Sequence, residues 1–115
     1  MRVLVVEDDA SLRVVIRMVL ERGGYEVDEA AHGRAALEKV AASRPDLVLA
    51  DMRMPFMGGL ELIHQLRSSS ASAAIPVVLL SGAAEVDAEH SASAVVTKPF
   101  EPDELLATIS SVLGS

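Results

Sequence analysis

The feature that most constrains the fold of this chain is a regular alternation between short apolar runs and segments of helical periodicity. The run Arg2–Val6 (RVLVV) is almost continuously apolar and rich in β-branched residues, as is typical of a strand covered on both faces. In the following segment, 11–22, apolar residues recur at the spacing of one helix face, and Gly23-Gly24 provides a stop. We therefore predict a strand followed by a helix.

The same alternation continues to the end of the chain. Further strands are predicted at 26–30, 47–50, 77–80 and 95–97, and further helices at 33–43, 58–68, 85–91 and 102–113. Strands that alternate with helices in this way indicate right-handed parallel crossovers, so we expect a doubly wound α/β sandwich. The stretch 68–74 (SSSASAA) is predicted to be a surface loop, and 1–115 a single domain.

The charge and apolar content exclude several classes of function. Ten Lys and Arg against 17 Asp and Glu give a formal charge of −7, which repels phosphate backbones and anionic membrane surfaces. We therefore expect no direct binding to nucleic acid or membranes, and no apolar stretch approaches the roughly 20 residues of a spanning helix. Cysteine is absent and acidic residues end the first apolar run at once, so we expect a cytoplasmic protein without a signal peptide.

Polar side chains follow the predicted strands at one edge of the sheet, where open α/β sheets bind their ligands. They are Glu7, Asp8 and Asp9 after the first strand, Asp51 after the third, Ser81 after the fourth and Lys98 after the fifth. Asp9 or Ser11 is most simply a helix N-cap. Glu7 and Asp8, however, would share a crevice with Asp51 if the first and third strands are neighbours.

These side chains have the composition of a phosphoryl-transfer site. Carboxylates that are brought together raise one another's pKa or demand a cation. Oxygen ligands without cysteine or a histidine pair favour Mg²⁺, or Mn²⁺, over Zn²⁺. Lys98 on the same rim would hold a phosphoryl oxygen. A carboxylate nucleophile, a cation, a lysine and a hydroxyl together form a phosphoryl-transfer site. His32, His64 and His90 have no ligand spacing and are expected to lie outside the site.

Four segments together resemble the signature segments of response-regulator receiver domains, and the resemblance spans the whole chain. They are VLVVEDD (3–9), DLVLADMRMPFMGG (46–59), VVLLSG (77–82) and VVTKPF (95–100). The resemblance implies a flavodoxin-like (βα)5 fold with strand order 2-1-3-4-5 and a role in two-component phosphorelay signalling. It also implies a sensor histidine kinase or phosphotransfer protein as phosphodonor and an unidentified downstream protein target. A homodimer is one possible assembly, because part of the apolar face of 102–113 could form a dimer or partner surface.

The same resemblance assigns roles to individual residues. Glu7 and Asp8 would form the acidic pocket, Asp51 would be the phosphorylated aspartate, and Ser81 and Lys98 would contact the phosphoryl group. Asp8, Asp51 and the backbone carbonyl of Arg53 would hold the metal. The Lys98–Pro99 bond would be cis, so that the lysine points inward.

Two features depart from the family pattern. Val95 occupies the switch position, three residues before the lysine, where relatives usually carry an aromatic residue. The segment between Ser81 and Lys98 is shorter than usual by roughly one helical turn or more, which implies a shortened fourth helix. We therefore expect intact phosphorylation chemistry, with the signal transmitted by movement of the segment 81–91 instead of rotation of an aromatic ring.

Three other functions share parts of this pattern. A haloacid-dehalogenase-type phosphatase normally needs a second Asp two residues after the nucleophile, where this chain has Arg53. A nucleotide-binding Rossmann domain needs a glycine-rich phosphate loop, where this chain has EDDAS. A receiver-like interaction module that is never phosphorylated remains as the main alternative. We expect a switch that catalyses its own phosphorylation and hydrolysis, not a turnover enzyme.

Overall fold

The structure is a computed structural model that describes residues 1–82 and 92–114. Its elements, in chain order, are β1 (Arg2–Val6), α1 (Ala10–Arg22), β2 (Glu26–Ala30), α2 (Gly33–Ala42), β3 (Leu47–Asp51), α3 (Gly59–Arg67), β4 (Val77–Ser81), β5 (Ala94–Thr97) and α4 (Pro102–Leu113). The helix predicted at 85–91 lies outside the described residues. So do the shortened fourth helix and most of the segment 81–91 that we expect to carry the signal.

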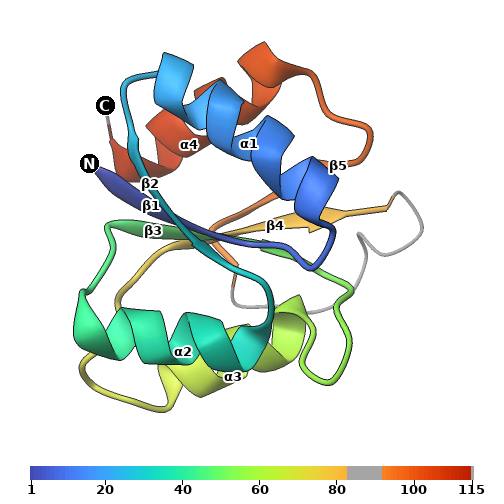
Figure 1. Ribbon diagram of the computed structural model, residues 1–115. Coiled ribbons are helices and arrows are strands. Elements are labelled where there is room, and N and C mark those ends of the chain that lie inside the picture. Colours follow the sequence, from blue (N-terminus) through green and yellow to red (C-terminus); the bar gives the residue numbers. More distant parts are fainter. Residues whose placement is uncertain (83–91, 115) are drawn as a thin grey trace.

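The five strands form one parallel sheet in the order β2-β1-β3-β4-β5. Helices α1 and α4 cover one face of the sheet, and α2 and α3 cover the other (Figure 1). The predicted doubly wound sandwich and its strand order are therefore confirmed. The chain passes from β1 outward to β2 and then returns to β3 on the other side of β1. The strand order thus reverses between β1 and β3, and the carboxyl ends of these two strands flank the expected binding crevice.

The continuous apolar runs of the central strands arise because each strand packs against helices on both faces. Every residue of β3 and β4 is buried. Neighbouring residues face opposite sides: Leu79 packs in the cluster beneath α2 and α3, whereas Leu80 packs in the cluster beneath α1 and α4. Burial of each such side chain stabilises the fold by about 1.5 to 3 kcal/mol relative to exposure.

Several element boundaries differ from the predicted ones by one residue. Helix α1 begins at Ala10 because the Asp9 carboxylate accepts hydrogen bonds from the amides of Ser11 and Leu12, at 2.9 and 3.2 Å. Asp9, and not Ser11, is therefore the N-cap. Strands β3 and β4 each extend one residue further, to Asp51 and Ser81, which pair with Leu80 and Thr97. The prediction that Asp51 and Ser81 follow their strands is wrong, since each is the last residue of its strand.

The helices bury one face and expose the other. Met18 on α1 is 58% exposed, and Leu60 on α3 is also exposed. On α4, Leu105 and Ile109 are fully buried, and their apolar neighbours pack against the same cluster. In the described part of the chain, no helix has the length and apolar character needed to cross a bilayer.

Candidate functional site

Three carboxylates converge at the carboxyl ends of β1 and β3. Val6 pairs with Ala50, so the residues that follow them, Glu7 and Asp51, emerge side by side. One carboxylate oxygen from each of Glu7, Asp8 and Asp51 lies within 4.8 Å of the other two. Glu7 and Asp51 are buried, whereas Asp8 is exposed to solvent. The crevice expected from the strand order therefore holds an oxygen-only donor set of the kind that suits a hard divalent cation.

Lys98 reaches this cluster from the end of β5. Its Nζ lies 2.7 Å from Oδ2 of Asp51 and 3.9 Å from Oε1 of Glu7. The backbone of the lysine is anchored as well, because its amide donates to the carbonyl of Ser81 at 2.8 Å. The Lys98–Pro99 bond is cis, as the family resemblance implied. One ammonium thus faces three carboxylates, which leaves the cluster with an excess of negative charge.

Glu7 has the most unusual environment in this cluster. Its Oε2 accepts a hydrogen bond from the Asp9 amide at 3.1 Å. Its Oε1 is buried and accepts no hydrogen bond within the described residues, and the lysine is too far away to donate one. Burial raises the pKa of Glu7 to about 7, the Asp9 amide opposes this shift, and the Asp51 carboxylate adds to it. A buried oxygen without a donor, beside two further carboxylates, is what a cation would satisfy.

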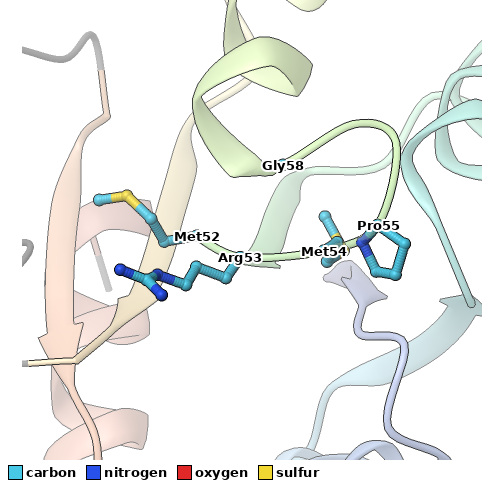
Figure 2. A pocket seen from close by; sticks show the side chains of 5 residues that line it. All are labelled: Met52, Arg53, Met54, Pro55 and Gly58. Carbon is cyan, nitrogen blue, oxygen red and sulfur yellow. The ribbon is translucent and has the colours of Figure 1, made fainter.

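The loop after β3 turns back toward the Asp51 carboxylate. The Arg53 amide donates to Oδ1 of Asp51 at 3.2 Å, so both carboxylate oxygens of Asp51 have partners. The loop borders a hollow of about 490 Å³ lined by Met52, Arg53, Met54, Pro55 and Gly58. Figure 2 shows the side chains of Met52 and Arg53 on one side of this hollow and those of Met54 and Pro55 at the other end. Met52, which follows Asp51 in the chain, is one of the residues that line this open hollow.

Two glycines allow α3 to begin directly against the end of β3. A Cβ at Gly58 would lie 2.7 Å from the carbonyl oxygen of Met52. A Cβ at Gly59 would lie 2.8 Å from the carbonyl oxygen of Asp51 and 2.7 Å from a Leu79 methyl group. Any side chain at either position would therefore displace the backbone that carries Asp51.

The two expected switch residues lie in different environments on neighbouring strands. Ser81 is fully buried, and its hydroxyl donates to the Gly82 carbonyl at 2.9 Å. Val95 is half-buried, pairs with Leu79 across β4 and β5, and packs against the cluster beneath α2 and α3. Ser81 thus lies at the edge of the sheet that carries the site, whereas Val95 lies within the sheet.

Sequence reasoning missed two polar contacts around the site. His32 caps α2, because its Nδ1 accepts a hydrogen bond from the Ala35 amide at 3.2 Å. Arg13 on α1 donates from Nη1 to the carbonyl oxygen of Glu7 at 2.7 Å. A histidine immediately before a helix could have suggested the cap. No local pattern indicates the arginine contact, which depends on how α1 packs against β2.

The fold and the site together define a class: a flavodoxin-like α/β domain with a lysine and a cluster of three carboxylates at the reversal point of its sheet. The profile of the family described as Response regulator receiver domain matches residues 3–110. The chain belongs to this family, the receiver domains of two-component response regulators.

Individual relatives agree with this assignment. The chain is 35% identical over 116 residues to the phosphate regulon transcriptional regulatory protein PhoB of Pseudomonas aeruginosa, covering 96% of this chain and 51% of that protein. It is 38% identical over 113 residues to the DNA-binding response regulator MtrA of Mycobacterium leprae, covering 94% and 49%. The chain therefore spans about half the length of these curated relatives.

A solved structure with the same fold is the receiver domain of the sensor histidine kinase PA1611 from Pseudomonas aeruginosa. It has a TM-score of 0.91 and 28% identity, and the match covers 99% of this chain and 98% of that one. That protein has a magnesium ion coordinated in its active site cleft.

Proposed function

We propose that Asp51 accepts a phosphoryl group from a phosphohistidine on a sensor histidine kinase or phosphotransfer protein. The observation that carries this proposal is the position of the Asp51 carboxylate, which is buried, hydrogen-bonded to Lys98 at 2.7 Å and part of a cluster with Glu7 and Asp8. A buried carboxylate beside a cation site and a lysine has the parts that phosphoryl transfer needs. Membership of the receiver family supports the same role.

The donor set fits Mg²⁺ or Mn²⁺. Asp8 and Asp51 would hold the ion together with the backbone carbonyl of Arg53, and the buried oxygen of Glu7 would accept from a metal-bound water. When bound, the cation would offset negative charge on the carboxylates and on the phosphoryl oxygens. The magnesium coordinated in the PA1611 receiver domain is consistent with this assignment.

The transfer would proceed by attack of an Asp51 carboxylate oxygen on phosphorus. The new O–P bond forms as the N–P bond of phosphohistidine breaks, and the imidazole leaves with the electron pair of that bond. The Asp51 carboxylate becomes a neutral acyl group, so the Lys98 ammonium gains a better partner in a phosphoryl oxygen. Water then cleaves the acyl phosphate and restores the carboxylate, which makes the protein a self-resetting switch and not a turnover enzyme.

The output would be a change in the surface that binds a downstream protein. Ser81 ends the strand next to β3, and its hydroxyl could exchange the Gly82 carbonyl for a phosphoryl oxygen. Such an exchange would move the chain that follows Ser81. Val95 has no ring to rotate, so the movement of the segment itself would carry the signal.

Intact mass after incubation with acetyl phosphate or phosphoramidate and Mg²⁺ tests the proposal. We expect one acid-labile addition of a phosphoryl group on the native protein and none after chelation of the metal. Asp51→Asn should abolish the addition because it removes the nucleophile. Asp103→Asn on α4 is the matched control, since it changes an exposed carboxylate outside the site and should leave labelling intact.

Absence of labelling under conditions that phosphorylate an ordinary receiver domain would contradict the proposal. The alternative of a receiver-like interaction module would then be favoured. Labelling that persists in Asp51→Asn would instead place the acceptor elsewhere.

A further inference from the structure

Arg13 connects the acidic pocket to the edge strand of the sheet. It lies on α1, and its side chain is only 20% exposed. Its Nη1 donates to the carbonyl oxygen of Glu7 at 2.7 Å, and its Nε donates to Oε1 of Glu29 at 3.0 Å. Glu29 belongs to β2, the strand next to β1. One guanidinium therefore joins the first loop of the site to β2.

This contact fixes the peptide unit from which Asp8 extends. The carbonyl of Glu7 and the amide of Asp8 belong to the same planar peptide group, so holding the carbonyl oxygen sets the direction in which Asp8 leaves the strand. The amide of Glu7 is already fixed, because it donates to the carbonyl of Ala30 at 3.1 Å. The Glu7 backbone is thus held by the Ala30 carbonyl, which belongs to β2, and by the Arg13 guanidinium, which is bound to Glu29 of β2.

We propose that Arg13 is a positioning residue for the cation site. Its guanidinium, held by Glu29, orients the Glu7–Asp8 peptide so that the exposed carboxylate of Asp8 converges with those of Glu7 and Asp51. The inference rests on the proposed function, because it concerns the affinity of the same site for a divalent cation. The planar fork of arginine can donate to two acceptors in fixed directions, which the single ammonium of a lysine cannot reproduce.

Positioning and simple electrostatics predict changes of opposite sign. Arg13 places a positive charge close to a site for a divalent cation, so removal of the charge alone should tighten cation binding. Loss of the hydrogen bond to Glu7 should weaken binding, because the donor atoms would no longer be held together. The direction of the change therefore distinguishes the two effects.

Arg17 is the matched control. It lies one turn further along α1 and forms ion pairs with Glu29 and Glu21. Arg17→Gln therefore removes the same charge from the same helix and one ion pair from the same Glu29. It leaves the contact between Arg13 and Glu7 in place.

The experiment is a Mg²⁺ titration of ¹⁵N-labelled protein without any phosphodonor, followed by amide chemical shifts. We expect Arg13→Gln to raise the Kd for Mg²⁺ at least threefold and Arg17→Gln to leave it unchanged or lower it. Arg13→Lys retains the charge and much of the packing, so it should still raise the Kd at least twofold. The amide spectrum of each variant also shows directly whether that variant is folded. If Arg13→Gln does not fold, the Kd of Arg13→Lys tests the positioning role.

Each outcome bears on one proposal or on both. Native protein that shows no shifts with Mg²⁺ would overturn the proposed function and the positioning role together. Native binding with equal or tighter binding in Arg13→Gln and Arg13→Lys would overturn the positioning role alone. Equal weakening in Arg17→Gln would also overturn it, because the effect would then belong to the ion pairs of Glu29 and not to the Glu7 carbonyl.

Discussion

At the scale of single residues, Glu7 shows how the fold changes the chemistry of a common side chain. In water its carboxyl group would be ionised at neutral pH, with an ordinary pKa of about 4.5. In the folded protein it is 1% exposed, one oxygen has no donor within the described residues, and its pKa rises to about 7. The metal-free pocket therefore holds a carboxyl group that is only partly ionised near neutral pH.

This pKa predicts a pH-dependent penalty on folding. Because the folded pKa is above the unfolded value, Glu7 costs nothing below about pH 4.5, and stability falls as the pH rises from there through 7. The full penalty is on the order of 3 kcal/mol, because each pKa unit between the unfolded value of 4.5 and the folded value of about 7 corresponds to about 1.4 kcal/mol. Glu7→Gln cannot ionise, so it should be more stable than the native protein at pH 8 and nearly equal to it at pH 4.5.

Urea unfolding in EDTA, followed by circular dichroism at several pH values, measures this difference. Asp28 and Glu29 have lowered pKa values because of their partners Lys39 and Arg17. The stability that these two carboxylates contribute is lost as the pH falls, in the native protein and in Glu7→Gln alike. It cancels in the comparison of native protein with Glu7→Gln. A stability difference that is the same at pH 4.5 and pH 8 would contradict the raised pKa.

At the scale of elements, the start of α1 determines how the acidic loop is held. The Asp9 carboxylate caps the helix by accepting from two amides, and the Asp9 amide donates to Glu7. The cap therefore connects the first turn of α1 to the pocket. Asp9→Ala should reduce the free energy of unfolding by about 1 kcal/mol, because it leaves helical amides without an acceptor.

A charge-matched variant separates the cap from electrostatics. Asp9→Asn also removes a carboxylate near the acidic cluster but retains a capping oxygen, so it should be more stable than Asp9→Ala by about 1 kcal/mol. Ser11→Ala is the control for position, since Ser11 is not the cap. Denaturant unfolding of the three variants gives the comparison, and equal stability of Asp9→Ala and Asp9→Asn would exclude the cap as the cause.

At the scale of the whole molecule, a cation bound only by the folded protein should stabilise the entire domain. The carboxylates of Glu7, Asp8 and Asp51 come together only when β1 and β3 pair. Mg²⁺ at 100 times its Kd should therefore raise the free energy of unfolding by about 2.7 kcal/mol. Asp8→Asn should be more stable than the native protein without metal, because it relieves repulsion, and should gain less from Mg²⁺.

Thermal unfolding in EDTA and in Mg²⁺, with ionic strength matched by NaCl, provides the measurement. Asp103→Asn again serves as the control and should respond to Mg²⁺ as the native protein does. A native melting temperature that does not change with millimolar Mg²⁺ would count against the cation site.

The sequence by itself determined the architecture of this protein. Hydrophobic periodicity is a local property, so the strands, the described helices and their order could be read from the spacing of apolar residues. Parallel crossovers put the carboxyl ends of all the strands at one edge of the sheet. The strand order that the receiver resemblance implies makes β1 and β3 neighbours, which brings Glu7, Asp8 and Asp51 together. Among the elements that the structure describes, the observed bounds differ from the predicted ones at the ends, as at Asp51 and Ser81, because caps and strand pairing decide where an element ends.

Only the tertiary structure decided how those residues interact. The 2.7 Å contact between Lys98 and Asp51 joins positions 47 residues apart, and the burial that raises the pKa of Glu7 depends on packing from several elements. The bridge from Arg13 to Glu29 likewise required α1 to lie against β2. Periodicity specifies which face of an element is buried, but distances, hydrogen bonds and desolvation between distant residues exist only once the faces have packed.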